Sequence, residues 1–212
     1  LPLSYKQDIA PYLPDIAGVI LSGGNDLSVC NETPLNKERD IFETNLIDLC
    51  IKDSIPLLGV CRGAQMIAYY FNSQITPCKN HVGLHEVTQN LESTIKVGGL
   101  QVLENKTKNL DFVNYALNPA AHPDLRENLE TTQRFITNSF HNYAITELGD
   151  GLIALAISSD TKDYSIESFK HKSHNIFGIM WHIERERGME NSEVFQKWKN
   201  TLYANSNNKD IK

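Results

Sequence analysis

The feature that most constrains the fold of this chain is a strand, tight turn and helix at residues 55–68. An apolar run of strand length ends in Gly-Val-Cys-Arg-Gly at residues 59–63, and a helical pattern follows directly. This is the sulfur counterpart of the nucleophile elbow, a turn that holds a reactive side chain above the end of a parallel strand. The pattern therefore predicts an α/β fold with Cys61 as its nucleophile.

The residues around Cys61 favour a catalytic role over a structural one. A small cysteine at the end of a core strand is more often only a packing residue. Here Gly59 and Gly63 leave room for a tight turn, and Arg62 and Gln65 are polar. At a helix N-terminus, free N–H groups and the helix dipole favour a thiolate. We expect Cys61 to be reactive if a histidine lies beside it.

A candidate partner lies near the other end of the sequence. Residues 175–181 form another apolar, strand-like run, which leads into His182, with Glu184 two residues later. In an extended segment, side chains at i and i+2 share a face. We therefore expect Glu184 to orient the His182 imidazole while the imidazole serves the thiol.

Composition and charge limit the class of protein. The chain has 212 residues, 41% of them hydrophobic, and a formal net charge of −6. This size suits one α/β domain spanning residues 1–212, and no internal repeat or linker is visible. The acidic balance argues against a nucleic-acid or anionic-membrane partner. No apolar run approaches the roughly 20 residues that span a bilayer.

The cysteines and the first residues add two expectations. The four cysteines show no paired spacing, which together with a thiol nucleophile indicates a reducing cytoplasm. The chain starts at Leu1 and not at a methionine, and residues 1–3 read like the tail of a strand. We expect an upstream strand and helix to be absent from this numbering.

Histidines also raise the question of a metal. His81 and His85 have the i, i+4 spacing of helical metal ligands, but Gly83 lies between them and no third ligand is evident. The sequence therefore predicts no metal site. A basic run at residues 170–174 could bind an anion but is more typical of a solvated surface.

The remaining pattern predicts alternating strands and helices. Further strands are expected at 16–21, 85–89, 152–157 and 165–169, and helices at 5–13, 38–52, 62–72 and 192–205. The loop after residue 21 reads Ser-Gly-Gly-Asn-Asp; it is either a plain turn or a set of backbone donors for an anion. Residues 94–103 suggest a hairpin. Residues 106–129 are interrupted by prolines, and surface elaboration is favoured there over a substrate cover.

Five segments together resemble the class I glutamine amidotransferase superfamily, in its γ-glutamyl hydrolase branch. They occur in the family order and cover nearly the whole chain. One departure is Ile183, which stands where the family usually has proline. The segments are residues 21–26 (LSGGND), 59–65 (GVCRGAQ), 138–142 (NSFHN), 166–169 (IESF) and 178–184 (GIMWHIE).

The resemblance implies a three-layer, flavodoxin-like fold with a mostly parallel sheet flanked by helices. It implies hydrolysis of a small-molecule γ-glutamyl amide through a glutamyl thioester, without a metal or organic cofactor, and leaves a homo-oligomer open. By this resemblance, Cys61 is the nucleophile, His182 is the base and then the acid, and Glu184 orients His182. The backbone N–H groups of Gly24 and Arg62 are the implied oxyanion donors. The side chains of Gln65, Ser139 and His141 are expected to help bind the glutamyl group.

Two other functions stay open at this point. One is a glutaminase subunit that supplies ammonia to a synthetase on a separate chain. This sequence shows no synthetase domain, which favours a stand-alone hydrolase over that alternative. A γ-glutamyl-γ-aminobutyrate-type hydrolase is a variant of the same chemistry with a different amine. A non-catalytic binding protein on the same scaffold is disfavoured because Cys61, His182 and Glu184 are all present.

Overall fold

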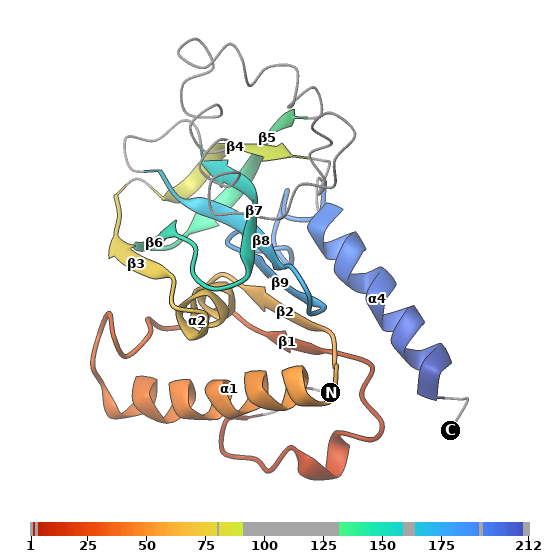
Figure 1. The fold of residues 1–212 in the computed structure, drawn as a ribbon. Coiled ribbons are helices and arrows are strands. Elements are labelled where there is room, and N and C mark those ends of the chain that lie inside the picture. The colour runs from red at the N-terminus through yellow and green to blue at the C-terminus, as the bar shows by residue number, and fades with distance from the viewer. Residues whose placement is uncertain are drawn as a thin grey trace.

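The computed structural model describes residues 2, 4–79, 81–90, 132–158, 164–190 and 193–209. A twisted sheet lies between two helical layers (Figure 1), with α1 (Pro34–Lys52) and α2 (Arg62–Tyr70) on one side and α4 (Glu193–Lys209) on the other. The short 3-10 helix η1 is Ala10–Tyr12. The strands are β1 (Val19–Leu21), β2 (Leu57–Val60), β3 (Gln74–Pro77), β4 (Val82–Asn90), β5 (Thr132–Phe140), β6 (Tyr143–Glu147), β7 (Leu152–Ser158), β8 (Ile166–His171) and β9 (Ile176–Ile179).

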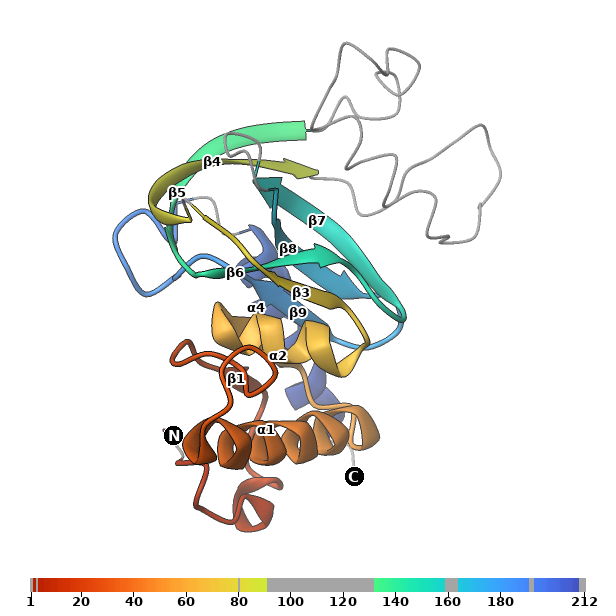
Figure 2. The same ribbon diagram turned by 90° about the vertical axis from the view of Figure 1, so that its left-hand side faces the viewer.

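The main sheet has the order β1-β2-β9-β8-β7-β4-β5. β1, β2 and β9 pair in parallel, and the other neighbours pair antiparallel. The α/β class with helices on both faces is confirmed, and the parallel part is the part that carries residues 61 and 182. Parallel pairing ends at β9 because β8 reaches β9 through a few residues, a connection too short for a crossover. Figure 2 shows how the antiparallel strands curl away from α1 and α2.

The two faces of the sheet enclose separate cores, because neighbouring side chains on a strand point to opposite faces. On β2, Leu57 packs into the core beneath α1 and α2, whereas Leu58 packs into the core beneath α4. On β9, Ile176 and Phe177 divide in the same way. Burial on both faces explains why these strands read as continuous apolar runs.

The start of α1 differs from the expectation. We predicted a helix from residue 38, but it begins at Pro34. Thr33 caps it, with its hydroxyl oxygen accepting the backbone N–H of Asn36 at 3.1 Å. Proline at the first helical position needs no donor, so this polar first turn is stable despite lacking apolar periodicity.

Other parts of the fold differ from the expectations or lie outside the described residues. The 5–13 helix shrinks to η1, and β3 and β6, which form a separate two-stranded antiparallel sheet, were not predicted. The predicted hairpin at 94–103 and the segment at 106–129 lie outside the described residues. Among the helices of the described part, none combines the length and the apolar character needed to cross a membrane.

Candidate active site

The turn between β2 and α2 holds Cys61 in a strained conformation. Its backbone angles are φ 51° and ψ −109°, a region that non-glycine residues rarely adopt. The turn is held in place by the Cys61 N–H, which donates to the Ile179 carbonyl of β9 at 2.7 Å. Strain of this kind, at the junction of a parallel strand and a helix, is the geometry of a nucleophile elbow.

Glycine is required on both sides of this turn. A Cβ atom on Gly59 would lie 2.5 Å from the Gly63 carbonyl oxygen. A Cβ atom on Gly63 would overlap the backbone carbonyl of Leu21 in β1. Neither obstacle is a movable side chain, so the close packing of α2 on the sheet depends on these two glycines.

We expect Gly63→Ala to lower the free energy of unfolding by about 3 kcal/mol or more, because the added methyl must displace backbone. Chemical denaturation monitored by circular dichroism would measure the loss. Gly18→Ala is the matched control, since its added Cβ would mainly meet a methyl group of Leu202, a side chain that can move. Equal stability of the two variants would contradict the steric argument.

The predicted contact between His182 and Glu184 is confirmed. His182 Nδ1 lies 2.6 Å from Glu184 Oε1, and because a carboxylate accepts, Nδ1 carries the proton. This leaves Nε2 of His182 as the basic nitrogen. The two residues lie in a turn after β9, so their contact comes from the turn and not from an extended strand.

The side chains of Cys61 and His182 both lie next to Gly23. A Cβ atom on Gly23 would lie 2.9 Å from His182 Cε1 and 3.7 Å from Cys61 Cβ. Both side chains therefore border the same glycine, although they are about 120 positions apart in the sequence. The spatial prediction that the two segments meet at one rim of the parallel strands agrees with this arrangement.

Asn138 of β5 holds the turn that carries His182. Its amide oxygen accepts the His182 N–H at 2.9 Å, and its amide nitrogen donates to the carbonyls of His182 and Glu186, each at 3.0 Å. Asn138 is buried. Sequence reasoning assigned it no role, although it lies in one of the segments that resemble the family.

The Cys61 thiol is not the preformed thiolate that the helix terminus led us to expect. Burial raises the pKa of Cys61 to about 11, although the Arg62 backbone N–H, which faces the sulfur, lowers it. The negative charges of Glu167 and Glu184 raise it further. Desolvation outweighs the helix dipole here, so a neighbouring base must take the proton during attack.

This pKa predicts how the free thiol reacts. The thiolate fraction rises tenfold per pH unit below the pKa. Alkylation of Cys61 by iodoacetamide should therefore keep accelerating from about pH 7 to pH 10 without a plateau. Mass spectrometry of the Cys61 peptide gives the rate at each pH. A plateau near neutral pH would instead indicate a preformed thiolate–imidazolium pair.

A buried charge network from α1 supports the glycine loop, and sequence reasoning missed it. Arg62 is 1% exposed and forms ion pairs with Asp40 and Glu43. Arg39 pairs with Glu43 at 2.7 Å and donates to the carbonyl of residue 22 at 2.8 Å and to that of residue 23 at 3.3 Å. The only signal of this network in the sequence was a cluster of charged residues at positions 38–43, near the start of the predicted helix. The network links the elbow to the loop that contains Gly24.

The residues expected to hold the glutamyl group are engaged within the protein. Gln65 donates from its amide nitrogen to the Tyr143 carbonyl at 2.8 Å. The Ser139 hydroxyl donates to the His81 carbonyl at 2.8 Å. His141 is 4% exposed, and its ring belongs to a buried group. These contacts favour a supporting role for the three side chains over direct contact with substrate.

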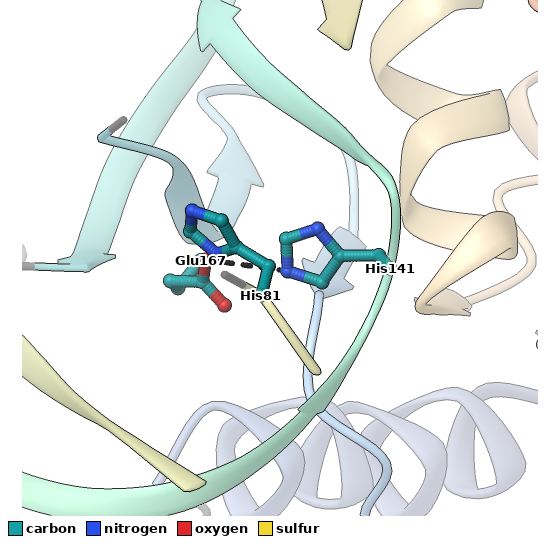
Figure 3. A group of neighbouring side chains, drawn as sticks. All are labelled: His81, His141 and Glu167. Atoms are coloured by element: carbon teal, nitrogen blue, oxygen red, sulfur yellow. Dashed lines mark ion pairs between the residues drawn. The ribbon is translucent and has the colours of Figure 1, made fainter. Parts of the chain in front are cut away.

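The buried group also contains His81 and His85, the two histidines that the sequence analysis considered as metal ligands. His81 Nδ1 and His141 Nε2 lie 3.7 and 3.5 Å from Oε1 of Glu167 (Figure 3). His85 Nε2 lies 3.5 Å from the other oxygen of Glu167. Burial would raise the pKa of Glu167, but the imidazoles of His141 and His85 hold it well below its usual range. The sequence analysis predicted no metal site because no third ligand was evident. In the structure, His141 and Glu167 lie beside His81 and His85.

The basic run is far from the candidate site. In the register of the sheet, Lys170 lies beside Phe177 near the start of β9, whereas Cys61 and His182 follow the ends of β2 and β9. Burial, and then the charges of His174 and Lys172, lower the pKa of His171 to about 4. The register thus places this run toward the opposite end of β9 from His182.

The fold and the site define a class of protein: an α/β scaffold that presents a cysteine elbow beside a histidine–carboxylate pair. Residues 1–184 match the Peptidase C26 family, and the chain belongs to this family. The chain is 44% identical over 198 residues to a gamma-glutamyl-CDP-amidate hydrolase from Campylobacter jejuni, a match that covers 93% of this chain and 77% of the relative.

Solved structures agree on the fold. A GMP synthase component from Thermoplasma acidophilum superposes with a TM-score of 0.61 at 20% identity, covering 95% of this chain and 80% of that one. A glutamine amido transferase from Methylobacillus flagellatus superposes with a TM-score of 0.51 at 12% identity, covering 88% of this chain and 56% of that one. The class I glutamine amidotransferase-like fold is thereby confirmed.

Proposed function

We propose that this protein hydrolyses a γ-glutamyl amide, with γ-glutamyl-CDP-amidate as substrate and glutamate and cytidine diphosphoramidate as products. The observation that carries the proposal is the strained Cys61 beside the His182–Glu184 pair. The relative from Campylobacter jejuni, 44% identical, supports the choice of substrate by its name. That choice also implies a role in modifying a capsular polysaccharide.

The reaction proceeds through a covalent thioester. His182 takes the thiol proton as Cys61 attacks the γ-carbonyl carbon, and backbone N–H groups of Gly24 and Arg62 hold the oxyanion. Each such donor contributes about 3 kcal/mol in comparable enzymes. His182 then gives the proton to the leaving nitrogen, the C–N bond breaks, and water activated by the same imidazole releases glutamate. No metal or organic cofactor takes part in these steps.

Arg185 is our proposed contact for a phosphate-bearing leaving group. Its guanidinium lies 4.3 Å from the centre of the Phe140 ring, and that ring lies 5.8 Å from the ring of His182. The positive charge of Arg185 is also close enough to lower the pKa of Cys61 against the effect of burial. Arg185 is exposed and thus accessible to an anion. A guanidinium is suited to bidentate contact with phosphate.

A screen for glutamate release tests both parts of the proposal. The compounds are γ-glutamyl-CDP-amidate, γ-glutamyl-γ-aminobutyrate, γ-glutamyl anilide and glutamine. The highest kcat/KM is expected for the CDP-amidate. A preference for γ-glutamyl-γ-aminobutyrate would move the protein to the alternative hydrolase type, and a preference for glutamine would support a glutaminase subunit.

Arg185→Gln should raise KM for the CDP-amidate about tenfold while leaving KM for the γ-glutamyl anilide nearly unchanged, because only the former carries phosphates. The lost charge beside Cys61 should change kcat similarly for both substrates. Lys172→Gln, at the opposite end of the strands, is the matched control. An equal change in KM for both substrates would show that Arg185 supports the site without binding the leaving group.

We further propose a reducing, cytoplasmic setting. All four cysteines are described and free, as expected where thiols stay reduced. A cysteine nucleophile also requires a reduced thiol. Fractionation of cells with an antibody to the native protein would test the location.

A further inference from the structure

The group formed by His81, His85, His141 and Glu167 has no part in the mechanism above. Its carboxylate lies on β8, and the imidazoles come from residue 81, from β4 and from the residue after β5. Glu167 is 0% exposed, and neither of its oxygens has a hydrogen-bond partner of ordinary geometry among the described residues. A carboxyl group buried without such partners needs a hydrogen-bond donor or a cation close to its oxygens.

The tautomer of His141 leaves a lone pair facing this carboxylate. Its Nδ1 lies 3.0 Å from the Tyr143 carbonyl, which can only accept, so Nδ1 carries a proton. In the neutral ring, Nε2 is then an acceptor, and it faces Glu167 Oε1, another acceptor, at 3.5 Å. A backbone carbonyl that orients an imidazole in this way is the usual outer support of a metal-binding histidine.

The spacing fits an ion between the groups better than direct ion pairs. A charged N–H···O bond from an imidazolium would measure about 2.7–2.9 Å. The observed N···O separations are 3.5–3.7 Å. Ligand atoms on a tetrahedral zinc ion, with bonds of about 2.0–2.1 Å, are separated by about 3.3 Å. One ligand atom each from His81, His141 and Glu167 lies within 4.8 Å of the other two, so small ring rotations would enclose one ion.

We propose that His81, His141 and Glu167 bind a divalent transition-metal ion of the zinc class. Two imidazoles and one carboxylate form a known three-ligand set for zinc. His85, on the other carboxylate oxygen, orients Glu167. Figure 3 shows the rings of His81 and His141 next to the Glu167 carboxylate. The centres of the two rings are 4.7 Å apart.

The location indicates a structural ion. The Glu167 carbonyl accepts the Met180 N–H at 2.7 Å, two residues before His182, and the His81 carbonyl accepts the His141 N–H at 3.1 Å. An ion here would join β8 to the segments before β4 and after β5, and thereby hold the antiparallel strands to the strand that positions His182.

Metal content tests the proposal independently of hydrolysis. The full chain, stripped with a chelator under mild denaturation and refolded with Zn²⁺, should retain about one equivalent by elemental mass spectrometry. X-ray absorption should show only nitrogen and oxygen ligands at about 2.0–2.1 Å. Loading should raise Tm by about 5–15 °C. Absence of bound metal, or sulfur among the ligands, would overturn the proposal whether or not the variants below fold.

Variants assign the ligands. Glu167→Gln and His141→Gln should lose the metal, and His85→Gln should weaken binding about 10–100-fold. His174→Gln is the matched control, because His174 lies beside His171 and outside the group. Its metal content should equal that of the wild type. Full metal content in a folded Glu167→Gln protein would also overturn the assignment.

Discussion

Replacing Cys61 with alanine is expected to lower kcat/KM for the γ-glutamyl amide by at least about 10⁴-fold, because Cys61 supplies the thiol whose side chain borders Gly23 together with the His182 ring. Without the sulfur no thioester forms, and His182 has no nucleophile to activate. Cys61→Ser should lose nearly as much, since a hydroxyl gives up its proton far less readily than the thiol. Stopped assays for free glutamate would measure the loss.

The fold of the Cys61→Ala variant should remain intact. Only one buried atom is removed, and the strained backbone is retained, so the free energy of unfolding should change by about 1 kcal/mol. Intact-mass analysis after a substrate pulse should detect an acyl adduct on the wild type and none on the variant. Retained turnover by a folded variant would refute the assignment of Cys61.

The second large effect concerns the order of losses at His182 and Glu184. His182→Ala should cost about 10⁵–10⁶-fold in kcat, because the buried thiol then has no base. Glu184→Gln should cost less, about 10²–10⁴-fold, because the amide can still contact Nδ1 but no longer stabilises the imidazolium. The Glu184 side chain is 58% exposed, so water partly replaces it.

The pH profile separates these two roles. The His182 hydrogen bond keeps the pKa of Glu184 below its usual range although burial would raise it, so the carboxylate stays ionised through neutral pH. Removing its charge takes away the negative partner of the imidazolium that forms during catalysis, so the acidic limb of the kcat profile should move to lower pH. Glu186→Gln is the matched control from the same turn. A larger loss in Glu184→Gln than in His182→Ala would show that the orienting residue was wrongly assigned.

The sequence alone predicted the elements whose causes are local. The apolar runs before Cys61 and His182 became β2 and β9, because strands buried on both faces contain continuous apolar residues. Gly59 and Gly63 predicted the tight turn, because a side chain at either position would meet backbone. The Gly-x-Cys-x-Gly pattern and the His-x-Glu pattern thus identified the candidate catalytic residues without coordinates.

Only the tertiary structure decided the properties that depend on distant segments. The pKa of Cys61 follows from burial by surrounding elements, which outweighs the local helix terminus. His141 and Glu167 lie beside His81 and His85 only because the antiparallel strands bring these distant segments together. Turn and strand patterns depend on neighbours along the chain and can be read from it. Desolvation and ligand convergence depend on which strands pair, and this sequence does not encode that choice at any one position.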